Sequence, residues 1–373
     1  MFRTRLLAAG LAATAVAGCA RNPATGGREL MLVSEAQEIE MGREYDKQVV
    51  ATIGLYPDPG LQRYVQELGG RLAATSERKQ LPWTFRVVDD PTVNAFALPG
   101  GFIYVTRGIM VHLNSEAELA SVLGHEIGHV TARHSASQIS RQQLAGLGLA
   151  IGSLASSAIE RYAGIASQAL GVLFLKFSRD DENEADRFGL RYVQRANYDP
   201  REMPHVFRLL DRLSTAQEGG GRLPEWLSTH PAPANRLERI NQQISTLEQD
   251  FSGAIINREG YERRLDGMVF GMNPREGFFK RTEFYHPELR FRLSFPPGWN
   301  TFNGKQAVAA ISPERDAIVE LTLAEGASAD AAARAFLSQD GLQGGALSRG
   351  QFHALGERRR RGTEGEPGPQ MVE

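Results

Sequence analysis

The stretch His125-Glu126-Ile127-Gly128-His129 has the spacing of a metal-binding helix that carries its own general base. Side chains at positions i and i+4 of a helix project from one face, so the two imidazoles can bind one ion. Glu126 is displaced around the helix by one position, which lets its carboxylate reach a metal-bound water rather than the metal. The stretch therefore predicts a zinc site with His125 and His129 as ligands and Glu126 as the general base.

The surrounding residues predict that this stretch lies within a helix with a buried face. Ser115 and Glu118 form a Ser-x-x-Glu capping box, which is typical of a helix start. Because a bare five-residue pattern also occurs by chance, the helical setting is what favours the site. Apolar residues follow the box at helical spacing, at Leu119, Val122, Leu123, Ile127 and Val130.

A zinc ion held by three protein ligands needs a third side chain, and Glu182-Asn183-Glu184-Ala185-Asp186 offers one. Glu182 and Asp186 are four positions apart, so both can face the zinc helix. We expect Glu182 to be the third ligand and Asp186 to accept the N–H of a ligand histidine. Glu184 is expected to point elsewhere, in a salt bridge. The alternative for this stretch is an exposed acidic helix start.

Two further motifs flank these residues. Upstream lies Asn94-Ala95-Phe96-Ala97-Leu98-Pro99-Gly100-Gly101, followed by Phe102-Ile103-Tyr104-Val105. Downstream lies Ser228-Thr229-His230-Pro231, followed by Arg236. In this order the four motifs resemble the CaaX-prenyl-protease/HtpX family of gluzincin zinc metallopeptidases, over roughly residues 35–250. The resemblance implies a peptidase of the periplasmic, BepA-like branch rather than of the branch with several membrane spans.

The resemblance implies a mainly helical zincin-like domain with a small sheet, an α+β fold. It also implies one Zn²⁺ per chain, on His125, His129 and Glu182. A strand before the zinc helix can pair its edge with an extended substrate backbone, which predicts broad side-chain specificity. The expected substrate-strand positions are Asn94, Ala95, Phe96, Gly100 and Gly101.

His230 and Arg236 are candidate catalytic residues whose roles the sequence leaves open. His230 is a fourth ligand that keeps the enzyme latent, a donor to the oxyanion, or a structural histidine before a proline. Arg236 either stabilises developing negative charge or anchors Asp186. His134 is off the expected metal face, so we place it behind the ligands or at the surface.

The N-terminal residues predict a lipoprotein signal. Arg3 and Arg5 precede a short apolar run at residues 6–16, which ends in Val16-Ala17-Gly18-Cys19. The run is too short to span a membrane. Cys19 is the only cysteine, and its position predicts a lipid-modified mature N-terminus. The next residue is Ala20, whereas an Asp in that position would resemble an inner-membrane retention signal. We therefore expect a periplasmic protein anchored to the outer membrane.

The length of 373 residues predicts two globular domains, and a net charge of −2 without a basic stripe argues against nucleic acid as a partner. Residues 144–175 are rich in small apolar side chains, and we expect a lid or a membrane contact there. We expect a signal peptide at 1–18, a lipid-anchored tether at 19–34, a metallopeptidase domain at 35–250, a connector at 251–283 and a small α/β domain at 284–373.

Periodicity predicts helices at 34–50, 61–74 and 329–337, and strands at 83–88 and 102–106. The C-terminal domain opens with an alternating strand at 291–295 and looks incomplete after residue 338. No tetratricopeptide-length repeat is present, which departs from BepA-like proteins. A protein partner of this domain is therefore left open.

Family and expected location together imply hydrolysis of peptide bonds in unfolded or misassembled envelope proteins. Three alternatives stay open: a proteolytically silent assembly factor, a lipoprotein whose C-terminal domain binds a partner, and a zinc-dependent cell-wall amidase. The intact Glu126 argues against the first. The spacing of Glu182 and Asp186 argues against the third.

Overall fold

The computed structural model describes residues 19–146, 176–217, 235–304 and 307–322, together with Trp226, Thr229, His230 and single residues between 328 and 338. The expected signal peptide and most residues of the 144–175 segment and of the 329–337 helix lie outside the described residues. The chain divides into two compact units, Met1–Gly271 and Met272–Glu373. No described helix has the length and apolar character of a membrane span.

The first unit contains a three-stranded sheet in the order β3 (Thr84–Val88), β5 (Phe102–Thr106) and β4 (Ala95–Leu98). β5 is parallel to β3 and antiparallel to β4, with Phe96 opposite Tyr104. The turn between β4 and β5 contains Gly100 and Gly101, both at positive φ, a backbone region that glycine enters without penalty. In the order β3, β5, β4, strand β4 pairs with β5 alone, so it is an edge strand within the described sheet.

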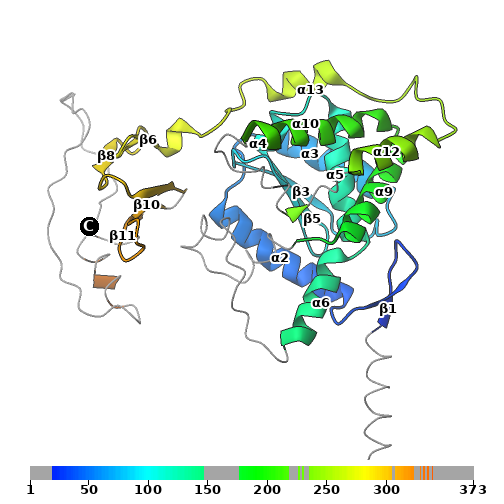
Figure 1. The fold of residues 1–373 in the computed structure, drawn as a ribbon, viewed down its shortest axis with the longest axis horizontal. Coiled ribbons are helices and arrows are strands. Elements are labelled where there is room, and N and C mark those ends of the chain that lie inside the picture. The colour runs from blue at the N-terminus through cyan, green and yellow to red at the C-terminus, as the bar shows by residue number, and fades with distance from the viewer. Residues whose placement is uncertain are drawn as a thin grey trace, which may run out of the picture. The chain divides into compact units, whose positions relative to one another are not determined.

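Helices cover both faces of this sheet (Figure 1). Side chains alternate along β5: Tyr104 packs in one cluster with Val49 of α2 (Glu35–Thr52). Ile103 packs in another cluster with α3 (Pro59–Ala73) and α5 (Glu116–Thr131). The predicted helices at 34–50 and 61–74 and both predicted strands are confirmed, and α5 lies directly against the sheet.

Every residue of α5 is buried. Ser115 caps the helix by accepting the Glu118 N–H, at 3.1 Å between Oγ and N. The predicted capping box is only half formed, because the Glu118 carboxylate bonds the backbone N of Asn114 instead, at 2.7 Å. The predicted start of the helix is thus confirmed, but the Glu118 carboxylate bonds the backbone of Asn114 and not that of Ser115.

α9 (Arg179–Arg195) packs along α5 at close range. A Cβ at Gly189 of α9 would lie 2.9 Å from the backbone N of His125. A Cβ at Gly128 of α5 would lie 2.8 Å from the carbonyl O of Ala185. Glycine at both positions lets the backbones of α5 and α9 approach each other closely. The spacing of the two helices in turn sets the distance between the side chains of α5 and those of α9 that face them.

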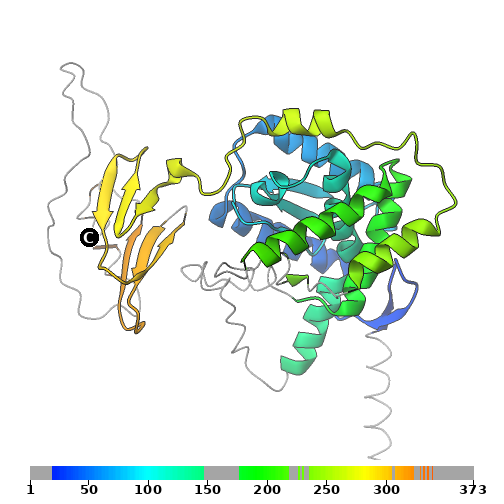
Figure 2. The ribbon, with the colours of Figure 1, turned by 45° about the horizontal axis from the view of Figure 1, so that its top comes forward.

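The remaining elements of this unit surround α5 and α9, with α9, α10 and α12 grouped beside the sheet (Figure 2). They are α4 (Arg107–Met110), α6 (His134–Gly146), η1 (Pro200–Glu202), α10 (Met203–Gln217), α12 (Arg236–Ser245) and α13 (Arg258–Leu265). α13 lies within the predicted connector, yet its Tyr261 is buried and donates to the carbonyl O of Met110 at 2.7 Å. The first part of residues 251–283 therefore belongs to the first unit.

Residues 19–34 differ from the predicted tether. β1 (Cys19–Arg21) and β2 (Arg28–Leu30) form an antiparallel hairpin. Asn22 is buried and its amide donates to the carbonyl O of Ala132, at the end of α5, over 2.8 Å. Met31 and Val33 pack against Ala136 of α6. These contacts hold the segment on the domain, so it is not a free linker.

The second unit is built from two three-stranded antiparallel sheets. Phe284, Phe295, Val308 and Ala310 form its core. Because β6 pairs with β7, this unit begins before the predicted boundary at residue 284. Its elements are η2 (Pro274–Glu276), β6 (Phe278–Lys280), β7 (Glu283–His286), β8 (Phe291–Ser294), β9 (Asn300–Asn303), β10 (Ala307–Ile311) and β11 (Ile318–Thr322).

Candidate metal centre

The two histidines of α5 face one point from successive turns of the helix. Their Nε2 atoms are 3.0 Å apart, and both side chains are at most 2% exposed. Two buried imidazole nitrogens that point their lone pairs at each other repel at this distance. A proton or a cation between them removes the repulsion. The i and i+4 spacing thus brings the pair together as predicted.

Glu182 approaches the pair from the first turn of α9. A capping box formed by Ser178 and Asp181 starts that helix, which places Glu182 just inside it. The Glu182 carboxylate lies 3.4 Å from Nε2 of His129 and 3.5 Å from Nε2 of His125, each measured to its nearer oxygen. The carboxylate is fully buried.

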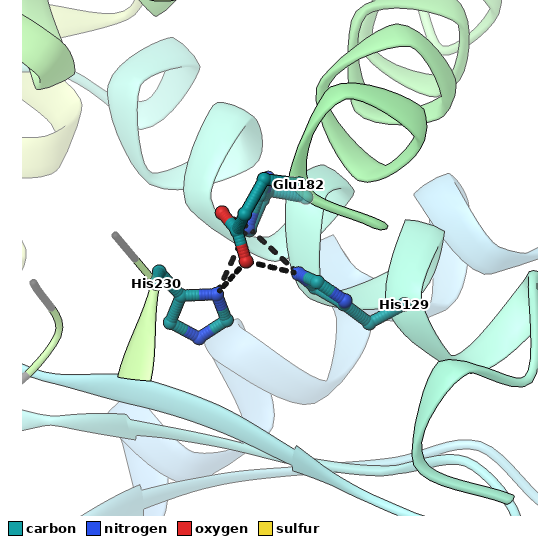
Figure 3. A group of neighbouring side chains, drawn as sticks. His129, Glu182 and His230 are labelled. Carbon is teal, nitrogen blue, oxygen red and sulfur yellow. Dashed lines mark hydrogen bonds and ion pairs between the residues drawn. The ribbon is translucent and has the colours of Figure 1, made fainter. Parts of the chain in front are cut away.

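His230 completes this group. Its Nδ1 lies 2.9 Å from Oε1 of Glu182 and 3.4 Å from Nε2 of His125. Figure 3 shows the Glu182 carboxylate between the imidazoles of His129 and His230. One ligand atom from each of the four residues lies within 4.8 Å of the other three. Sequence reasoning left His230 open, and the structure places it among the ligand atoms.

This donor set fits a divalent metal ion. Three imidazole nitrogens and one carboxylate oxygen, gathered in a buried space, are ligands that suit Zn²⁺. Oε2 of Glu182 makes no hydrogen bond to any described residue, although Nη1 of Arg236 is 3.0 Å away as an ion pair without hydrogen-bond geometry. A buried carboxylate oxygen without a hydrogen bond keeps a lone pair that a metal ion in the group could use.

The electrostatics of the group prepare His129 and Glu182 as ligands, whereas in the absence of a metal ion they favour the protonated form of His230. Burial lowers the pKa of His129 well below its usual range, which keeps the imidazole neutral. For Glu182, burial acts to raise the pKa, but His230 and Arg236 outweigh it and hold the pKa well below its usual value. Burial likewise opposes a charge on His230, yet Glu182 and Glu126 raise its pKa. An ionised carboxylate and a neutral imidazole are the forms that bind metal.

Glu126 lies beside the four residues without joining them. It is fully buried, and its Oε1 accepts from Nε1 of Trp226 at 3.3 Å. Its Oε2 accepts no hydrogen bond from any residue that the structure describes. The nearest His230 nitrogen, Nε2, is 3.7 Å from Oε1. One carboxylate oxygen is therefore held in place while the other is free to accept a proton.

Asp186 holds His125 from behind. Its Oδ1 lies 2.9 Å from Nδ1 of His125, and Arg236 binds both carboxylate oxygens. Burial acts to raise the pKa of Asp186, but Arg236 and His125 outweigh it and the pKa is lowered. A charged acceptor at Nδ1 leaves Nε2 of His125 as the metal-facing nitrogen. Arg236 thus contacts Asp186 as the anchoring role requires, and it also lies 3.0 Å from Glu182.

The comparisons with known proteins agree with this geometry. A family model described as peptidase family M48 matches residues 59–244. The chain belongs to peptidase family M48. The matched region runs from α3 to α12 and includes every residue of the metal centre, while the second unit lies outside it. Membership of this family implies a divalent metal ion.

Three relatives illustrate how far the similarity of this M48 domain extends. The chain is 36% identical over 222 residues to the beta-barrel assembly-enhancing protease of Yersinia pestis, covering 57% of this chain and 45% of that protein. It is 40% identical over 170 residues to mitochondrial metalloendopeptidase OMA1 of Arabidopsis thaliana, covering 46% and 33%. With the Schizosaccharomyces pombe OMA1 it shares 33% over 226 residues, covering 60% and 65%. The chain spans less than half the length of the first two.

The predicted substrate strand lies next to this centre. β4 pairs only with β5 among the described strands, so its other edge has no described strand as a partner. Oδ1 of the buried Asn94, just before β4, has no hydrogen-bond partner among the described residues. Ala95 and Phe96 lie in β4 itself. Gly100 and Gly101, by contrast, form the turn, and a Cβ at Gly100 would lie 2.6 Å from Cα of Ile39, so they shape the strand's end and are not on its edge.

Sequence reasoning gave no role to Trp226 and Phe177, and it left His134 either behind the ligands or at the surface. Trp226 bonds Glu126, and Phe177 stacks on His129 with ring centroids 4.0 Å apart. His134 lies behind His129, and its partner is Glu184, which was expected only in a salt bridge. The one local signal was a histidine five positions after His129, a spacing that does not place it on the same face of one helix.

Proposed function

We propose that this M48 domain is a zinc metalloendopeptidase that hydrolyses peptide bonds of unfolded or misassembled envelope proteins. The observation that carries the proposal is the convergence of a set of metal ligands and a general base in one buried space. His125, His129 and Glu182 face one another as ligands, and Glu126 presents a free carboxylate oxygen beside them. The names of the relatives, proteases and metalloendopeptidases, support the same reaction class.

A bound Zn²⁺ would supply Lewis-acid activation of water and of the scissile carbonyl. The residues of the chain supply the proton transfers and the positioning. Oε2 of Glu126 takes the proton as water attacks and then delivers it to the leaving amine. Asp186 fixes the ring of His125, and the outer edge of β4 aligns the substrate backbone by hydrogen bonds.

For His230 we propose the fourth-ligand role in the resting protein. Its Nδ1 is closer to Glu182 than either α5 histidine is, and this supports a place within the ligand group. A centre closed by four protein ligands leaves no position for water. Cleavage then requires His230 to leave the group, so the resting enzyme is latent. Arg236 is a positioning residue in this scheme, because it acts through Asp186.

We also propose that the protein is held on the outer membrane, facing the periplasm, by lipid on Cys19. The apolar run at residues 6–16 and the Val16-Ala17-Gly18-Cys19 sequence support this placement. The relatives named beta-barrel assembly-enhancing proteases support an envelope setting for the substrates. A protein partner bound through the second unit stays a proposal of the same kind.

The decisive experiment compares the full-length protein with its Glu126→Gln variant. Both are purified in detergent, loaded with Zn²⁺, and incubated with an unfolded protein while cleavage is followed by gel. We expect slow cleavage by the wild type, limited by the fraction of molecules in which His230 has left the group, and none by the variant. Zinc content should be equal in both proteins, because Glu126 is a base and not a ligand. Equal cleavage by both would contradict the mechanism. Failure of both to bind zinc would contradict the metal centre itself.

A further inference from the structure

His134 is a buried histidine that directly contacts a proposed metal ligand. It begins α6, two turn residues after the end of α5, and its side chain is 3% exposed. Its Nδ1 lies 2.9 Å from Nδ1 of His129, and the two rings are inclined at 73°. On its other side, Nε2 lies 3.4 Å from Oε2 of Glu184 and 3.8 Å from Oδ1 of Asp181. The three residues His129, His134 and Glu184 therefore form a continuous row.

The direction of the hydrogen bonds in this row follows from the proposed metal centre. A neutral imidazole carries one N–H and one lone pair. If Nε2 of His129 gives its lone pair to the metal, Nδ1 of His129 must carry the hydrogen and donate it. Nδ1 of His134 must then accept, which leaves the hydrogen of His134 on Nε2, directed at the carboxylates of Glu184 and Asp181. The opposite direction would place a hydrogen on the ligand nitrogen of His129.

The turn that presents His134 is held by residues outside the metal centre. Arg133 adopts φ of 60°, a conformation that a non-glycine residue occupies at a cost. Its guanidinium is bound by the buried Glu38 of α2 and donates to the carbonyl O of Val33 at 2.7 Å. Asn22 of the N-terminal hairpin holds the preceding residue, Ala132. Both contacts restrain the backbone directly before His134.

We propose that His134 is a positioning residue that orients His129 and fixes its tautomer, with Glu184 fixing the tautomer of His134 in turn. The inference rests on the proposed function, since it requires His129 as a ligand. In this arrangement each histidine of α5 has one hydrogen-bond acceptor at Nδ1. The acceptor is the Asp186 carboxylate for His125 and the His134 imidazole for His129. Groups in such positions raise the basicity of the ligand and hold its ring toward the metal.

The test measures zinc affinity of the full-length protein, by competition with a fluorescent chelator. His134→Leu removes the acceptor while keeping an apolar side chain of similar length, and we expect affinity to fall about 10- to 100-fold. His134→Asn places an amide oxygen near the position of Nδ1, and we expect it to recover most of that loss. The melting temperature of the metal-free protein reports folding, and the rise in melting temperature on adding Zn²⁺ should shrink in the leucine variant alone.

The outcomes separate this inference from the proposed function. Zinc affinity of His134→Leu equal to the wild type, while His125→Ala abolishes binding, would overturn the role of His134 and leave the metal centre intact. Equal losses in the leucine and asparagine variants would also overturn it, because the acceptor would not matter. If the leucine variant does not fold, Glu184→Gln is the second variant: we expect a severalfold loss of zinc affinity, and an unchanged affinity would overturn the inference. Wild type without bound zinc would refute the proposed function first.

Discussion

Arg236 binds Asp186 through two parallel hydrogen bonds, Nε to Oδ2 at 2.5 Å and Nη2 to Oδ1 at 2.6 Å. Both side chains are at most 5% exposed, and the same carboxylate accepts from Nδ1 of His125. The planar guanidinium matches the carboxylate in a way that a lysine ammonium would not. One ion pair between α9 and α12 thus carries the orientation of a proposed metal ligand on α5.

Breaking this pair should destabilise the fold. Arg236→Gln leaves the carboxylate of Asp186 buried without its charge partner, and we expect the free energy of unfolding to fall by about 3–5 kcal/mol. Urea denaturation of the metal-free protein measures this value. The matched control is Arg263→Gln, whose ion pair with Glu259 is highly exposed, and we expect a change within about 0.5 kcal/mol. Equal, small changes in both variants would contradict a structural role for the Arg236 pair.

The lowered pKa of Asp186 predicts a dependence of stability on pH. A carboxyl whose folded pKa lies below its unfolded value of 3.8 contributes stability above that value. The contribution is lost as pH falls through the folded pKa. We therefore expect metal-free wild type to lose more stability than Asp186→Asn between about pH 5 and pH 2. Denaturation series at fixed ionic strength provide the measurement, and parallel curves for the two proteins would refute it.

The close packing of α5 on α9 predicts a steric effect on the metal centre. In Gly189→Ala the new Cβ meets the backbone of His125, and no flexible side chain can yield there. We expect α9 to shift, zinc affinity to fall, and the free energy of unfolding to drop by about 1–3 kcal/mol.

Gly70→Ala is the control for this substitution. Gly70 also lies in a helix, α3, but nothing is within 4 Å of its Cβ position. Less backbone entropy in the unfolded chain should stabilise this variant by about 0.4–1 kcal/mol. If Gly189→Ala is as stable as Gly70→Ala and binds zinc as tightly as the wild type, the contact between the two helices does not set the geometry of the centre.

Removing His230 should separate its three predicted roles. As a fourth ligand it blocks the water position, so we expect His230→Ala to bind zinc more weakly but, at saturating zinc, to cleave an unfolded protein severalfold faster. An oxyanion donor would give the opposite result, a loss of about 100-fold or more in rate. An unchanged rate would indicate a structural histidine. His286→Ala, in the second unit, serves as the control and should match the wild type.

Local patterns in the sequence were sufficient for the main elements of the first unit. The period of apolar residues and the cap at Ser115 predicted α5, and the i, i+4 spacings predicted which side chains of α5 and α9 share a face. The hairpin within residues 19–34, a segment expected to be a tether, was not predicted. Its two strands have three residues each, and its anchor is a bond from Asn22 to a residue 110 positions later. A contact over such a separation leaves no periodic signal.

The sequence by itself determined the chemistry of the centre: two histidines, a glutamate between them, and a second acidic helix, each recognisable from spacing within five residues. Only the tertiary structure decided which further side chains reach that chemistry. It placed His230 among the ligand atoms, set Arg236 on Asp186, and brought His134 and Glu184 behind His129. The reason is physical. Spacing along a helix fixes the direction of a side chain relative to its neighbours on that helix. Contacts between elements depend instead on how closely their backbones pack. Here the glycines where α5 and α9 meet set that distance.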